Sequence, residues 1–169
     1  MNRMLLATVV TGLVAASLSS HPQQATTTDQ FVGSWKVVKL KEISGDEVSY
    51  PLGQQVAGYV TITPYRLWLL IVDPTRKAPA TAALTDAEAG EMMKSHVAWT
   101  GKYLTANDTR QGITFTAHID TASSQAITGD DRVFFIRVED NRLVMKSPGV
   151  VVPMTGATSS VEIELVQAD

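Results

Sequence analysis

Two side chains of this sequence could move a proton together: the imidazole of His118 and the phenol of Tyr103. His118 belongs to the stretch 113–120, whose alternating residues predict a β-strand with His118 on its polar face. If that polar face lines a cavity, an imidazole near the Tyr103 phenol could act as an acid or base in an isomerisation or cyclisation. If the apolar face points inward instead, His118 faces solvent and carries no chemistry.

Other reaction classes lack the residues that they need. The three histidines, His21, His96 and His118, have no His-x-His or His-x-x-x-His spacing and no accompanying carboxylate cluster, so no metal site is predicted. The chain has no cysteine, which excludes thiol nucleophiles and iron–sulfur clusters. It also lacks a Gly-x-Ser-x-Gly elbow and a glycine-rich phosphate loop. We therefore expect no metal and no cofactor.

The N-terminal residues predict the location of the protein, and its net charge limits the classes of partner. Residues 1–20 carry Arg3 ahead of an uncharged apolar run, which predicts a signal peptide cleaved somewhere between residues 16 and 25, and a secreted or periplasmic protein. That run is too short to span a membrane. A disordered segment over 21–30 and one domain over 31–169 are predicted to follow. A formal net charge of −3 without a basic run argues against nucleic acid.

The domain is predicted to be mainly β. Short apolar or alternating runs separated by turn residues are typical of an antiparallel sandwich or barrel. Eight such strands can close into one antiparallel β-barrel. The predicted strands cover residues 33–43, 56–63, 65–72, 99–105, 112–120, 131–139, 142–147 and 159–166.

One helix is predicted over Asp86–Ala98, between the third and fourth predicted strands. Thr85 and Glu88 form a capping box at its start, and apolar residues follow at helical spacing. The third strand, Tyr65–Val72, is apolar on both faces, so something must cover its outside. The helix is the expected cover, and a second copy of the chain in a homodimer is the alternative.

Several aromatic residues could either fill the barrel or line a ligand pocket, because eight strands leave room for both arrangements. Met92 and His96 on the helix could form a lid over the barrel mouth. Asn107 begins a glycosylation sequon, Asn-Asp-Thr. The candidate ligand-binding residues are Tyr59, Trp68, Met92, His96, Trp99, Tyr103, Phe115 and Phe134.

The sequence resembles the lipocalin-like domain family from about Phe31 to Val166. The likeness rests on the segments 32–38, 50–53, 58–59, 99–103, 116–120, 131–135 and 141–143. Members of the family often carry a His-His pair where this chain has Ala117-His118. The resemblance implies a barrel with a cavity. It also implies that Gly33 and Trp35 form a plug at one end, with a late-strand cation, here Arg132, stacked over the indole.

Two functions that use the cavity are consistent with these residues, beside that of a structural or assembly protein whose apolar third strand and helix pack on a partner subunit. The first is an exported lipocalin-like barrel that binds a small, mostly apolar molecule in its cavity. The alternative is a cofactor-independent cyclase, isomerase or lyase that acts on a hydrophobic small molecule, with His118 and Tyr103 as its catalytic residues.

Overall fold

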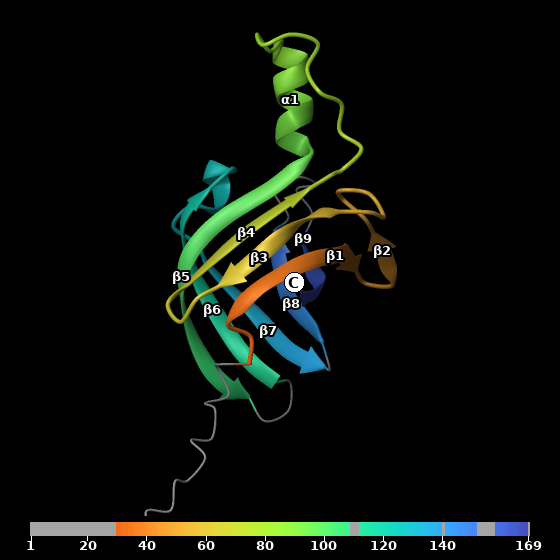
Figure 1. Cartoon of the computed structure of the whole chain (residues 1–169). Coiled ribbons are helices and arrows are strands. Elements are labelled where there is room, and N and C mark those ends of the chain that lie inside the picture. Colours follow the sequence, from red (N-terminus) through yellow and green to blue (C-terminus); the bar gives the residue numbers. More distant parts are fainter. Residues whose placement is uncertain (1–29, 109–111, 140, 152–157, 169) are drawn as a thin grey trace, which may run out of the picture.

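Each long strand pairs antiparallel with the next one along the chain, and the last pairs back with the first (Figure 1). The computed structural model describes residues 30–108, 112–139, 141–151 and 158–168. The result is a closed eight-stranded antiparallel barrel, which confirms the predicted architecture. Its strands are β1 (Gly33–Ser44), β3 (Ala57–Ile62), β4 (Arg66–Val72), β5 (His96–Asp108), β6 (Gly112–Ala122), β7 (Asp131–Glu139), β8 (Arg142–Val151) and β9 (Thr158–Gln167).

A short strand, a 3-10 turn and one helix complete the described elements. The short strand β2 (Glu47–Ser49) forms a hairpin with the end of β1 and stands outside the closed ring. A 3-10 turn, η1 (Gln125–Ile127), links β6 to β7. The helix α1 (Asp86–Lys94) follows β4. The position predicted for it, between the third and fourth strands, is off by one because β2 was not predicted.

The helix also ends earlier than predicted. Ser95 closes it with its N–H and hydroxyl on the carbonyl oxygen of Met92. From His96 onward the backbone pairs with β4, so that Val97 lies opposite Ile71. The predicted helical end at Ala98 is therefore wrong, because sheet pairing captures these residues. The predicted start is confirmed: Thr85 and Glu88 form the reciprocal capping box.

Helix α1 does not cover the barrel. Figure 1 shows it projecting beyond one end of the sheet, and it contains no buried residue. On the outside of β4, Trp68 is 45% exposed and Leu70 is 50% exposed. The prediction that the helix covers this strand is therefore wrong. The loop after β4 and the extension of β5 carry the helix away from the wall.

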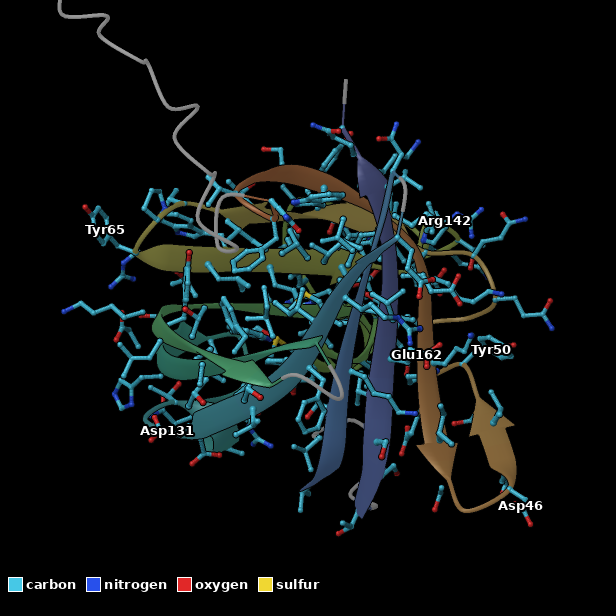
Figure 2. All side chains as sticks on the ribbon, turned by 90° about the horizontal axis from the view of Figure 1, so that it is seen from below. Asp46, Tyr50, Tyr65, Asp131, Arg142 and Glu162 are labelled. Atoms are coloured by element: carbon cyan, nitrogen blue, oxygen red, sulfur yellow. The ribbon has the colours of Figure 1, made fainter. Side chains whose placement is uncertain are left out.

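Alternation decides which side chains fill the barrel. In β9, Ile163 and Leu165 are buried, whereas Glu162 and Glu164 point outward and bind Lys41 at 2.8 and 2.6 Å. Figure 2 shows side chains crowding the space between the strands and labels Glu162 beside β9 and β1. The alternation of apolar and acidic residues in the sequence of this strand therefore matches its inward and outward positions in the structure.

Strand β1 contains one residue more than regular alternation allows. Val37 pairs with Leu165, and Lys39 pairs with Glu164, which leaves Val38 without a partner in the ladder. This β-bulge lets both Val37 and Leu40 point inward while Val38 faces outward.

Close strand approach requires glycine at two positions of the wall, Gly58 of β3 and Gly101 of β5. A Cβ atom at Gly101 of β5 would overlap the backbone carbonyl of His118 on β6. The ladder between these strands shifts register between Thr100 and Gly101, where β6 carries an extra residue.

The described residues contain no helix with the length and apolar character needed to cross a bilayer. The predicted leader and nearly all of the segment 21–30 lie outside the described residues, as does Thr109 of the sequon at Asn107. These assignments stay predictions.

Candidate functional site

An apolar cavity opens at the end of the barrel to which β4 and β8 run. Its volume is about 100 Å³. Nearly every side chain in its wall is aliphatic or aromatic, because inward positions of β4, β5, β7 and β9 all contribute. The lining residues are Leu40, Pro51, Leu69, Ile71, Val97, Trp99, Ile119, Ile127, Arg132, Phe134, Ser147, Val150, Val151, Val161 and Ile163.

Aromatic rings divide the barrel interior into this cavity and a filled end. Trp99 and Phe134 stack in the cavity wall, with ring centroids 5.9 Å apart and planes 13° from parallel. Four residues further along β5, Tyr103 stacks on Phe115 with centroids 4.1 Å apart. Of the predicted ligand-binding aromatics, the structure therefore places Trp99 and Phe134 in the cavity. Tyr103 and Phe115 fill the other end.

The filled end is closed by Phe31 and Trp35. Phe31 is fully buried, with its ring near those of Tyr103 and Phe115. The indole Nε1 of Trp35 donates to the carbonyl oxygen of Phe31 at 2.8 Å. The backbone of Gly33 adopts a positive φ of 148° between them.

Arg132 does not stack over Trp35. It lies in the cavity wall near the start of β7, and its guanidinium pairs with Asp130 at 2.8 Å. The cation found over an indole is instead Arg66, whose guanidinium carbon is 6.0 Å from the ring centroid of Trp68. The plug predicted from the resemblance therefore needs correction: its partner for Trp35 is Phe31.

Tyr59 and Trp68 lie outside the barrel. Tyr59 is 54% exposed on β3, because its neighbour Val60 takes the inward position, and Trp68 is exposed on β4 next to buried Leu69. The predicted cavity position of these two residues is therefore wrong. Together with Leu70 they form an exposed apolar strip, which is where a second copy of the chain would pack. The homodimer stays a prediction.

His118 and Tyr103 lie on opposite faces of the wall. The His118 side chain is 57% exposed, and its Nδ1 lies 2.8 Å from a carboxylate oxygen of Asp131. The Tyr103 side chain points inward, its hydroxyl donates to the carbonyl oxygen of Thr63 at 2.5 Å, and burial raises the pKa of the phenol. The two side chains do not meet at one substrate, so the predicted acid–base pair is not formed.

The predicted lid is also absent from the mouth. His96 is the first residue of β5, and its Nδ1 lies 2.8 Å from the Met92 carbonyl oxygen. Met92 borders a separate hollow between α1 and the loop 73–80. Within the described ranges, no group of three His, Asp or Glu side chains could hold a metal ion.

The cavity wall also contains a buried polar residue, Ser147, that was not singled out from the sequence. Ser147 is 1% exposed, and its hydroxyl has no hydrogen-bond partner within the described part of the chain. A signal for it exists, because β8 places Leu143 and Met145 inward and the next inward position is this serine.

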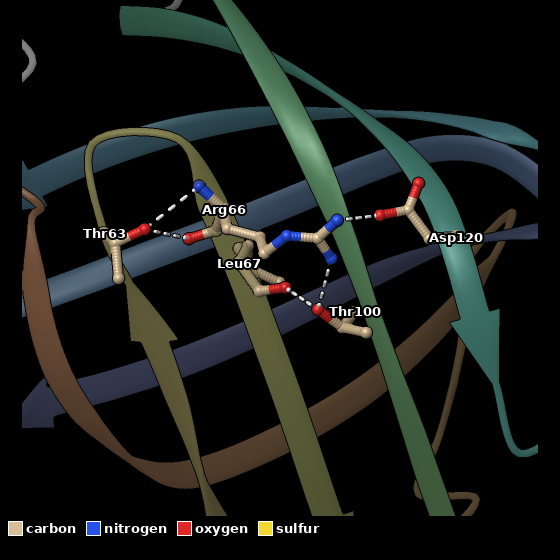
Figure 3. A network of polar contacts seen from close by, with 5 residues as sticks. All are labelled: Thr63, Arg66, Leu67, Thr100 and Asp120. Atoms are coloured by element: carbon tan, nitrogen blue, oxygen red, sulfur yellow. Dashed lines mark hydrogen bonds and ion pairs between the residues drawn. The ribbon is translucent and has the colours of Figure 1, made fainter.

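A polar network fastens the outside of the wall near the closed end (Figure 3). The Arg66 guanidinium pairs with Asp120 across β5 and also contacts the Thr100 hydroxyl at 3.5 Å. Thr100 donates to the Leu67 carbonyl at 2.9 Å, and the Arg66 N–H donates to the Thr63 hydroxyl at 3.1 Å. These contacts join β4, β5 and β6, and they leave the cavity without any charge from this network.

A closed antiparallel barrel, plugged at one end and hollow at the other, defines the class of this molecule: a small lipocalin-like β-barrel. Comparison with protein families agrees. The family model described as the lipocalin-like domain matches residues 32–168, so the chain belongs to this family, as the resemblance predicted. No curated protein matches the chain in sequence.

Proposed function

We propose that this protein binds a small, mostly apolar molecule in the cavity at the open end of the barrel. The observation that carries the proposal is the cavity wall itself, in which Trp99, Phe134 and aliphatic side chains converge on about 100 Å³. Binding sites for small molecules are concave and predominantly apolar, with few polar groups. The lipocalin-like family to which the chain belongs supports the same function.

The size of the cavity limits what it can hold. A dry cavity of about 150 Å³ admits benzene, whereas sites for drug-sized ligands reach about 300 to 1,000 Å³. This cavity therefore fits a compact molecule or one end of a longer molecule. Val151, which lines the cavity and is 53% exposed, supplies apolar surface for the remainder.

The cyclase or isomerase alternative gains no support from the geometry. His118 faces solvent beside Asp131, and the Tyr103 hydroxyl is bonded to Thr63 in the filled end. Neither side chain borders the cavity, so we do not propose a reaction.

We also propose that the protein is exported to a secreted or periplasmic location. The support is the cation and apolar run of residues 1–20. The mass of the protein recovered from the medium or periplasm tests this proposal. A product that retains residue 1 would contradict it.

Ligand binding is best tested by tryptophan fluorescence. In a Trp68→Phe background, the emission comes from Trp35 in the plug and Trp99 in the cavity, so a ligand in the cavity should change the Trp99 contribution. Leu69→Phe should fill the cavity and abolish the response. Tyr59→Ala, on the outer face, is the matched control and should leave it unchanged. A folded protein that responds to no member of an apolar panel would overturn the proposal.

A further inference from the structure

We propose that the ligand is a neutral, compact apolar molecule that carries one oxygen atom, a carbonyl or hydroxyl, which the hydroxyl of Ser147 binds inside the cavity. This inference rests on the proposed function and specifies the chemistry of the same site.

Ser147 is the polar anchor that the cavity offers. Its side chain is 99% buried in the cavity wall, and its hydroxyl has no hydrogen-bond partner among the residues that the structure describes. A buried hydroxyl without a partner is costly in an apolar environment, and a ligand oxygen within reach would remove that cost.

The register of the sheet places this hydroxyl beside the aromatic wall. Phe135 pairs with Lys146, so the next residue on each strand, Phe134 and Ser147, point together into the interior. On the other side, Ser147 pairs with Val161 of β9. A ligand packed on the Phe134 ring therefore lies next to the one side-chain hydroxyl among the described lining residues.

The second buried serine shows how an occupied hydroxyl looks in this barrel. Ser159 is 4% exposed, and its hydroxyl lies 2.6 Å from a carboxylate oxygen of Glu42. Ser159 is not among the residues of the cavity wall. Ser147 thus lines the cavity and has no described hydrogen-bond partner, whereas Ser159 is hydrogen-bonded and is not a lining residue.

The charges around the cavity favour a neutral ligand. Among the described lining residues, Arg132 is the only charged one, and its guanidinium is already paired with Asp130. An anionic ligand would lose its hydration without gaining a free cation.

Two nearly isosteric probes isolate the hydrogen bond. Cyclopentanone and methylenecyclopentane have the same six heavy-atom skeleton and differ in C=O against C=CH2. Cyclopentanecarboxylate adds an anionic arm. Methyl NMR signals of Ile71, Ile119 and Ile163, which line the cavity, report the Kd of each probe for the whole protein.

Ser147→Ala should weaken cyclopentanone binding by about fivefold and change the Kd of methylenecyclopentane by less than about twofold, as expected for the loss of one hydrogen bond. Ser147→Cys keeps a weak donor, so its Kd for cyclopentanone should lie between those of the wild type and Ser147→Ala. This variant replaces Ser147→Ala if the alanine variant does not fold. Ser159→Ala is the matched control, and it should keep the wild-type ratio of the two Kd values.

Each other outcome overturns the inference in a distinguishable way. If Ser147→Ala affects both probes equally or neither, the cavity binds apolar molecules but Ser147 does not select an oxygen. If the carboxylate binds more tightly than the ketone, the ligand is not neutral. If no probe shifts the cavity methyl signals, the proposed function fails together with the inference.

Discussion

The indole nitrogen of Trp35 and the carbonyl oxygen of Phe31, 2.8 Å apart, close the barrel end that lies away from the cavity. The bond is buried, and it draws the chain that enters β1 under the aromatic pair of Tyr103 and Phe115. Trp35 is 4% exposed. These contacts place its indole in the closed end of the barrel.

Replacement of Trp35 should lower stability without a contribution from Arg132. Trp35→Phe loses buried area and leaves the Phe31 carbonyl without its donor, which should cost about 2 to 4 kcal/mol of unfolding free energy. Arg132→Met breaks a partly exposed ion pair and should cost less than about 1 kcal/mol. Urea unfolding measures both. Equal losses would show that the Arg132 guanidinium supports the plug after all.

Removal of the Ser147 hydroxyl should stabilise the ligand-free protein. Ser147→Ala deletes a buried polar group that has no protein partner, and we expect a gain of about 1 kcal/mol. Ser159→Ala deletes the donor to Glu42 and should instead destabilise the protein. Thermal unfolding compares the two variants, and a lower Tm for Ser147→Ala would contradict the assignment.

Two glycine-to-alanine changes should act in opposite directions. Gly101→Ala would drive a Cβ atom into the His118 carbonyl, so strands β5 and β6 would have to separate, at a cost of about 3 kcal/mol or more. Gly90, inside α1, has open space around it, so Gly90→Ala should gain about 0.5 to 1 kcal/mol through helix propensity. Chemical denaturation distinguishes them. A neutral Gly101→Ala variant would refute the close approach of the strands.

Acid should weaken the seam between β1 and β9. The hydrogen bond from Lys41 lowers the pKa of the Glu164 carboxyl below its ordinary 4.5, so this group contributes fully above that pH and loses its contribution as pH falls through the lowered value. Hydrogen bonds to Glu162 and Glu164 raise the pKa of Lys41, which therefore stays charged throughout this range. Urea midpoints from pH 7 to 3 should fall more steeply for wild type than for Glu164→Gln. Parallel curves would contradict the prediction.

Replacement of His118 should leave the protein nearly unchanged. The imidazole is exposed and paired with an exposed carboxylate, so His118→Gln should alter stability by less than about 0.5 kcal/mol. It should also leave the ligand response of the Trp68→Phe background intact. Loss of that response would place His118 in the binding site.

The barrel was predictable because its signals are local. Alternation in β9 and the capping box at Thr85 depend on neighbouring residues, and both agree with the structure. Strand β2 escaped prediction because all three of its residues are exposed and carry no apolar period. The true end of α1 escaped because Val97 pairs with Ile71, a contact between strands that helical spacing cannot reveal.

The site was only partly predictable, because contacts between strands decide which side chains reach the cavity. Trp99 and Phe134 reach the cavity as ordinary inward positions of their strands. Trp68 could not be placed, since its strand is apolar on both faces, and the sheet register puts Leu67 and Leu69 inside instead. The sequence could not identify Ser147 as a candidate binding residue, because only the packing of the neighbouring strands shows that its hydroxyl has no described partner.

The unpaired Val38 has a consequence for how β1 can vary in length. Because Val37 and Lys39 already pair with successive residues of β9, deletion of Val38 would join two correct stretches of ladder. Leu40 and Glu42 would keep their inward facing, whereas an insertion or deletion anywhere later in the strand would turn its interior residues out. Deletion of one residue at this bulge of β1 should therefore keep the same side chains inside the barrel.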